Sequence, residues 1–172
     1  TLVLAAGRVL PHRIADHPFV APFSDLAARD QFVGIAQAIT LEWENIPASL
    51  CEWLEQRRRT CPSSAVLRVI QDRIRQKQFL VAHHIPVSSF TVLDTPGQLV
   101  GAVDRLGFPA VCKTATAGYD GKGQWVLRDP ADIALVQQAI EVRQPGQRWI
   151  LEQFVEFERE LSALVVRDDG DD

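Results

Sequence analysis

The glycine-rich stretch TATAGYDGKGQ, residues 114–124, limits the possible folds more than any other part of the sequence. It follows the apolar run FPAVCK and leads into the apolar run QWVLR, and each run predicts a strand. Two neighbouring strands joined by a loop of about ten residues are expected to pair antiparallel. The sequence therefore predicts a β-hairpin whose loop holds three glycines.

This loop has the composition of a phosphate-binding element, because missing side chains let backbone N–H groups approach phosphate oxygens. Its order, G-x-x-G-x-G between two strands, differs from the Walker A loop and from the dinucleotide fingerprint, which both lead into a helix. Lys113 ends the incoming strand and Lys122 lies inside the loop. We interpret the hairpin as a flap that carries two cations. The alternative is a flexible turn with lysines that bind nothing.

The first half of the chain alternates strand-like runs with helical patterns. The runs RVL, HPFV and AITLEW surround an amphipathic helix expected over 26–36, and this βαβ order predicts a parallel sheet with helices on its faces. Further helices are expected over 48–56 and from Pro62 to the His83-His84 pair. The apolar positions of the last helical stretch form one stripe, which we expect in the core: Val66, Leu67, Ile70, Ile74 and Phe79.

The second half has a different order. Thr95-Pro96-Gly97-Gln98 has the pattern of a capping box, and Gly107 stands where a left-handed cap ends the helix. The hairpin, a helix over 129–140, and strands over 149–155 and 161–166 follow. The fold class is therefore α/β, with α+β in the second half, and the boundary is expected between residues 84 and 95. The buried helix face before Gly107 is expected to be Leu99, Val100, Val103 and Leu106.

Composition and charge exclude several classes of protein. A hydrophobic fraction of 47% supports a packed core, and no apolar run reaches the roughly 20 residues of a membrane helix. The net charge is −4, whereas nucleic-acid binding typically requires a broad basic surface. The three cysteines fit neither a disulfide framework nor a zinc site, and the first residues lack the features of a secretory signal. We expect reduced, structural cysteines and a cytoplasmic protein.

Four motifs in the same order carry a resemblance to a known family: LEWENIP at 41–47, IQDRIRQKQF at 70–79, IPVSSF at 85–90, and FPAVCKT followed by GYDGKGQ. Together they resemble the 5-(carboxyamino)imidazole ribonucleotide synthase family of ATP-grasp enzymes. The resemblance implies a partial, Rossmann-like pre-ATP-grasp domain over 1–86 and a small ATP-grasp B domain over 87–155. Residues 156–172 would begin the C-terminal ATP-grasp domain. The chain has no methionine and ends soon after LSALVV, so we expect a fragment that lacks the extreme N-terminus and the C-terminal third.

The resemblance also implies roles for particular residues. Arg73 and Lys113 would contact ATP phosphates, and Glu160 would bind the ribose hydroxyls. The alternative for Glu152 and Glu160 is that they are solvated acids on an edge strand. Glu156, Glu158, the histidine pair and Cys112 have no expected ligand, and no catalytic residue is assigned. The flap over the triphosphate would comprise Gly118, Tyr119, Asp120, Gly121, Lys122, Gly123 and Gln124; the hinge strand that reads adenine would comprise Glu152, Gln153, Phe154 and Val155.

The implied activity is an ATP-dependent carboxylation in purine biosynthesis. ATP would phosphorylate bicarbonate to carboxyphosphate, and 5-aminoimidazole ribonucleotide would receive the carboxyl group. Mg²⁺ would take part, with ligands expected beyond Asp172 and none in this chain, which alone should not turn over. The implied partners are small molecules, with neither nucleic acid nor membrane, and a homodimer is an option.

Three alternatives stay open. The formate-dependent glycinamide ribonucleotide transformylase is an ATP-grasp relative with a GKGQ flap, but its flap is rich in serine at the position of GYD, residues 118–120. Another ATP-grasp ligase is the second alternative. The third is a paralogue that binds nucleotide without catalysis.

Overall fold

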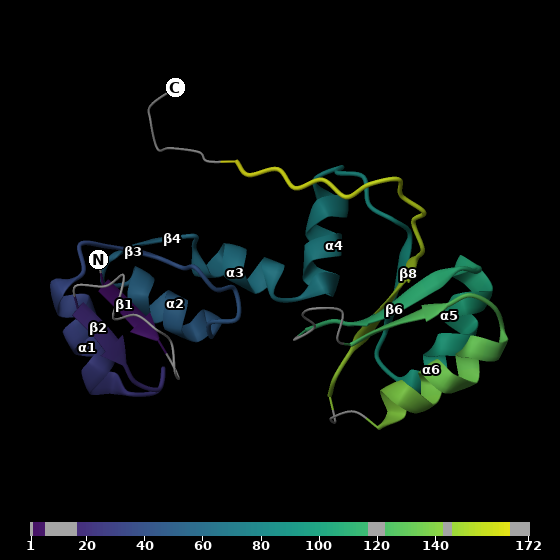
Figure 1. Cartoon of the computed structure of the whole chain (residues 1–172), viewed down its shortest axis with the longest axis horizontal. Helices are drawn as coiled ribbons and strands as arrows, with labels where there is room; N and C mark the ends of the chain where they lie inside the picture. Colours follow the sequence, from purple (N-terminus) through teal and green to yellow (C-terminus); the bar gives the residue numbers. More distant parts are fainter. Residues whose placement is uncertain (1, 6–16, 117–122, 143–145, 166–172) are drawn as a thin grey trace.

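The computed structural model describes residues 2–5, 17–116, 123–142 and 146–165. Figure 1 shows an N-terminal part with short parallel strands and a C-terminal part built on one antiparallel sheet, with α3 (Ser64–Ile70) and α4 (Arg73–Ala82) between them. Within the described part of the chain, no helix is long and apolar enough to cross a membrane.

The N-terminal part contains two separate parallel strand pairs. β1 (Leu2–Ala5) pairs with β2 (His17–Val20), and β3 (Ala38–Thr40) pairs with β4 (Arg59–Cys61). The strands are parallel as predicted, but the pairing expected across the helix between β2 and β3 is not formed among the described residues, because these two strands lie in different pairs. The strand expected at RVL lies outside the described residues. β4 was not predicted, because its sequence Arg-Thr-Cys lacks a clear apolar alternation and only Thr60 is buried.

Two helices cover these strands, and both were predicted. They are α1 (Leu26–Ile35) and α2 (Ala48–Glu55). The side chain of Asp25 caps α1 by accepting a hydrogen bond from the backbone N–H of Ala28 at 3.1 Å. The buried residues of this part come from both helices and from β3: Phe32, Val33, Ala36, Ile39, Leu50 and Leu54.

The long helical stretch predicted from Pro62 is broken, and the prediction of one continuous stripe was wrong. Asp72 lies between α3 and α4 in an extended conformation, and its side chain caps α4. Since the break changes the helical phase, the apolar positions do not share one face. Leu67 and Ile74 are buried, whereas Val66 and Phe79 are 48% and 46% exposed. The predicted end at the histidine pair is confirmed, because α4 ends at Ala82.

The C-terminal part is a four-stranded antiparallel sheet in the order β5-β8-β6-β7. Its predicted hairpin is confirmed, with Ala110 opposite Leu127 and Lys113 opposite Gln124. The strands are β5 (Phe90–Leu93), β6 (Ala110–Thr114), β7 (Gln124–Leu127) and β8 (Trp149–Gln153).

The two faces of this sheet have different coverings. Helices α5 (Leu99–Leu106) and α6 (Ala131–Glu141) pack on one face over a core that includes Trp149 and Leu151 of β8. The start of α4 packs on the other face, where Ile74 contacts Ala115 and Ile150. Because side chains alternate along a strand, β8 supplies core residues to one face and Ile150 and Glu152 to the other.

The local signals before α5 are largely confirmed. The capping box is present, with Pro96–Gln98 forming a short 3₁₀ turn ahead of the helix. Gly107 ends α5 with a positive φ of 83°, although its ψ of −179° is extended rather than left-handed helical. Val100 was expected to be buried and is 44% exposed.

Two strand predictions near the C-terminus were wrong. β8 ends at Gln153 rather than at residue 155, and residues 161–165 form neither strand nor helix in the structure. A strand requires a neighbour for its backbone hydrogen bonds, and no strand among the described residues pairs with this segment. The domain boundary at residues 86 and 87 stays a prediction.

Candidate functional site

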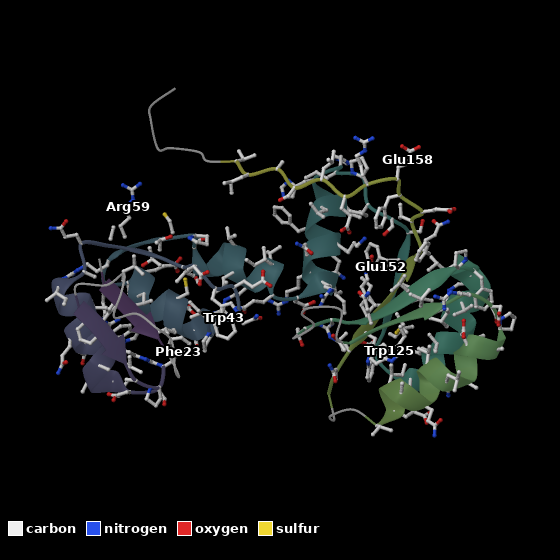
Figure 2. The ribbon with its side chains drawn as sticks, viewed as in Figure 1. Phe23, Trp43, Arg59, Trp125, Glu152 and Glu158 are labelled. Carbon is white, nitrogen blue, oxygen red and sulfur yellow. The ribbon has the colours of Figure 1, made fainter. Side chains whose placement is uncertain are left out.

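A buried carboxylate, that of Glu152, is the centre of the candidate site. Glu152 lies on β8, a central strand of the sheet, and Figure 2 shows it beside α4. Its Oε2 is 3.2 Å from Nζ of Lys113 on β6 and 3.2 Å from Nζ of Lys77 on α4. The residue is 7% exposed, so the interpretation as a solvated acid on an edge strand was wrong. Two ammonium groups offset the cost of removing this carboxylate from water.

Lys77 was missed by the sequence analysis, although it is tied into the same cluster. Its ammonium donates to Oγ of Ser88 at 2.8 Å, and that hydroxyl donates to Oε2 of Glu152 at 3.5 Å. One signal could have found it. The sequence has three lysines against 15 arginines, and two of the three meet on one oxygen atom. Lysine is a compact, flexible point charge, so the scarcity of lysine in this sequence makes each lysine a candidate for a specific role.

Arg73 lies at the end of β6, next to the cluster. Its backbone N–H donates to the carbonyl of Ala115 at 2.8 Å, and its Nη1 donates to the carbonyl of Thr114 at 3.1 Å. Both bonds fix the first turn of α4 against the strand that carries Lys113. The N-terminus of this helix adds the partial positive charge of its dipole to the two cations.

Asp72 connects the N-terminus of α4 to the start of β8. Its Oδ1 accepts from the backbone N–H groups of Ile74 at 2.9 Å and Arg75 at 3.2 Å, which caps α4. Its Oδ2 is 3.1 Å from Nη2 of Arg148, the residue before β8. Arg73 is therefore held by its own bonds to residues 114 and 115 and by the pairing of the preceding residue, Asp72, with Arg148.

The base of the predicted flap stands beside Lys113. The backbone N–H of Thr114 donates to the carbonyl of Gly123 at 2.8 Å, and Gly123 has a φ of 79°, which favours glycine. Gln124 is exposed and pairs with Lys113 across the hairpin. The remaining flap residues, Gly118, Tyr119, Asp120, Gly121 and Lys122, lie outside the described residues.

The predicted hinge begins at Glu152 and continues through Gln153, Phe154 and Val155. The N–H of Gln153 donates to the carbonyl of Ser89 at 2.9 Å, and the N–H of Phe154 donates to that of Pro109 at 3.0 Å. Both side chains are exposed, as is that of Val155. Glu160 is exposed, and the strand predicted directly after it is not formed over residues 161–165.

The other candidates have no place in this cluster. Cys112 is fully buried in the core, and burial raises the pKa of its thiol to about 12, which makes it a poor nucleophile. His83 follows the last residue of α4 and its ring lies 4.3 Å from that of Phe79, as expected for a helix terminus. Glu156 and Glu158 are exposed, and Figure 2 shows Glu158 on the outer segment.

The geometry is therefore that of an anion-binding site. Lys113 and Arg73 approach one edge of the sheet together with a helix N-terminus, and a hairpin loop begins at the same edge. Backbone and cationic donors of this kind bind phosphate oxygens. Among the described residues, no three His, Cys, Asp or Glu side chains are grouped so as to hold a metal ion.

Comparisons with known proteins agree with the fold. A family model described as the ATP-grasp domain matches residues 78–171, and one described as the ribonucleotide synthetase preATP-grasp domain matches residues 4–71. These matches confirm the predicted fold class, a pre-ATP-grasp domain followed by ATP-grasp structure.

Individual relatives match most of this chain. It is 34% identical over 155 residues to the N5-carboxyaminoimidazole ribonucleotide synthase of Bacillus subtilis, which covers 90% of this chain and 40% of that protein. A bifunctional purine synthesis protein of Dictyostelium discoideum is 32% identical over 90% of this chain and 15% of its own length. A solved ADP complex of an N5-carboxyaminoimidazole ribonucleotide synthetase superposes with a TM-score of 0.82 at 33% identity, covering 91% of this chain and 41% of that one. The chain thus spans less than half the length of these relatives.

Proposed function

The chain belongs to the ATP-grasp family, and on that premise we propose that the protein carrying it uses ATP to carboxylate 5-aminoimidazole ribonucleotide with bicarbonate. The products are N5-carboxyaminoimidazole ribonucleotide, ADP and phosphate, and the reaction belongs to purine biosynthesis. The ATP-grasp match over more than half of the residues supports the nucleotide, and the names of the relatives support the second substrate.

One observation carries the nucleotide part of this proposal: Lys113 and Arg73 lie together where the glycine hairpin begins. We place the phosphates of ATP at these two cations, under the flap that the sequence predicts for residues 118–124. The base lies along the hinge at residues 152–155. Since the N–H groups of Gln153 and Phe154 already donate within the protein, the base meets other backbone groups of this strand.

The chemistry asks for charge neutralisation and exclusion of water rather than for a protein nucleophile. An oxygen of bicarbonate attacks the γ-phosphorus, ADP leaves, and carboxyphosphate forms. The amine nitrogen of the ribonucleotide then attacks the carboxyl carbon of carboxyphosphate, and phosphate leaves. Cations next to the transferring phosphoryl group stabilise its charge, and a closed flap keeps water from the carboxyphosphate.

Magnesium would neutralise charge on the phosphates, with ligands from residues beyond Asp172. Glu160 as the ribose ligand and a homodimeric assembly also stay proposals. Sedimentation of the intact protein measures the second directly.

The test is release of phosphate from ATP by the intact protein. We expect release that requires both bicarbonate and 5-aminoimidazole ribonucleotide. Equal release with formate and glycinamide ribonucleotide would instead assign the transformylase reaction. Nucleotide binding without turnover on either substrate pair would indicate a non-catalytic paralogue.

A substitution of Lys113 tests its proposed contact with the ATP phosphates. Lys113→Ala should raise the ATP concentration needed for half-maximal rate by about tenfold or more, because a charge-assisted contact to phosphate is lost. Arg105→Ala, on α5 and away from this face of the sheet, is the control and should leave the kinetics unchanged. Unchanged kinetics for Lys113→Ala would contradict its placement at the phosphates.

A further inference from the structure

The two lysines on Glu152 lie at the same distance from its Oε2 but differ in their surroundings. Lys77 is anchored a second time, to Ser88 at 2.8 Å, and its side chain is 16% exposed. Lys113 is 27% exposed, and its strand ends at the flap. One ammonium is thus held within the fold, and the other stands at the edge of the phosphate region.

The contacts of the Glu152 carboxylate fall on one of its two oxygens. Both ammonium groups and the hydroxyl of Ser88 meet Oε2. In the described part of the chain, Oε1 accepts no hydrogen bond. A carboxylate held through one oxygen presents the other at a fixed position, and as a carboxylate it can only accept.

We propose that Lys77 is a positioning residue for nucleotide selection: it holds Glu152 in place through Oε2, so that Oε1 accepts from the exocyclic amine of adenine. This inference rests on the proposed function, in which the base lies along residues 152–155. Lys77 stays on the carboxylate when Lys113 turns to the phosphates, and the buried charge of Glu152 is then never left without a cation.

The proposal predicts different effects on nucleotide binding when each lysine is removed. Removing Lys113 weakens every nucleotide that carries the same phosphates, whatever its base. Removing Lys77 loosens the acceptor and so affects the choice of base. Inosine diphosphate is the matched probe, because it differs from ADP in having a carbonyl in place of the exocyclic amine. That carbonyl would face the Oε1 acceptor without a proton to share.

The experiment measures dissociation constants of ADP and inosine diphosphate for the intact protein by titration calorimetry. Wild type should prefer ADP by about tenfold or more, the value of one hydrogen bond to a charged acceptor. Lys77→Met should reduce this preference to about threefold or less, while Lys113→Met should weaken both ligands and keep their ratio. Gln78→Met, exposed on the same helix, is the control and should match wild type.

The outcomes separate this inference from the proposed function. If the wild type binds neither diphosphate, the nucleotide site itself is refuted. Equal affinity of wild type for the two ligands overturns the inference alone, and so does a Lys77→Met variant with the wild-type ratio. A purely structural role for Lys77 would lower the unfolding midpoint without moving that ratio. Should Lys77→Met fail to fold, Lys77→Gln keeps a polar group beside Glu152 and must show the same fall in preference.

Discussion

Replacing Asp72 should loosen α4 and leave the rest of the molecule folded. Asp72 has two functions that a pair of substitutions can separate. Its Oδ1 caps the helix, and its Oδ2 pairs with Arg148 at 3.1 Å. Asp72→Ala removes both functions, whereas Asp72→Asn retains a good capping residue and removes only the charge.

The structure sets the expected magnitudes. Loss of an N-cap costs about 1 kcal/mol. The ion pair adds about 0.5 kcal/mol, because the side chain of Arg148 is 43% exposed and water screens the interaction. Asp72→Ala should therefore cost about 1.5 kcal/mol, or roughly a tenfold rise in the opening equilibrium of the helix. Asp72→Asn should cost about 0.5 kcal/mol, which is roughly a twofold rise.

Amide hydrogen exchange of the intact protein measures these changes on the peptide that spans residues 73–82. Asp25→Ala is the control, since Asp25 caps α1 in the same way and should speed exchange in α1 only. Equal acceleration of α4 by the Ala and Asn variants would show that the cap contributes nothing. No acceleration by Asp72→Ala would refute the whole account of how α4 begins.

Three further predictions concern stability, each measured by urea unfolding. Gly107→Ala should destabilise by about 1–3 kcal/mol because of its positive φ, whereas Gly34→Ala, inside α1 with open space around it, should stabilise by about 0.5–1 kcal/mol. Equal effects would contradict the backbone argument. Leu151→Ala should cost about 2–5 kcal/mol and Leu135→Ala, 67% exposed, less than about 0.5; similar losses would refute the assigned core. Burial raises the pKa of Cys112 from 9.0 to about 12, so only the unfolded state loses this proton between those values, and stability should fall with rising pH there by up to about 1.4 kcal/mol per unit. Cys112→Ala should remove that part of the slope, and an unaltered slope would exclude this origin.

Local signals in the sequence predicted local structure well. The capping box at Thr95, the positive φ at Gly107 and the end of α4 depend on residues within one turn, so they can be read from a short stretch. The break at Asp72 could not, because aspartate is tolerated inside a helix as well as at its start. The break coincides with contacts to distant residues: Asp72 pairs with Arg148, 76 residues further along the chain, and Arg73 bonds to the carbonyls of Thr114 and Ala115.

The residues of the candidate site also differ in whether local sequence or distant contacts determine them. Lys113 and Glu152 could be named from motifs, since both lie in recognisable strands. Lys77 lies on a helix among polar residues, and its role exists only once α4 packs against the sheet and brings it to β8. The segment after Glu160 shows the reverse case, because its apolar run predicted a strand that has no partner among the described residues.

The placement of Glu152 explains how a site can be both buried and rigid. β8 is hydrogen-bonded on both sides, and its alternate residues, Trp149 and Leu151, are anchored in the core under α5 and α6. The strand therefore fixes the face that Glu152 occupies and the point from which its side chain starts. The carboxylate at the end of that side chain is held by the two lysines on Oε2. The lysines then need only to neutralise the charge and choose which oxygen is free. For this reason changes to Leu151 should affect stability first, while changes to Lys77 should affect selectivity first.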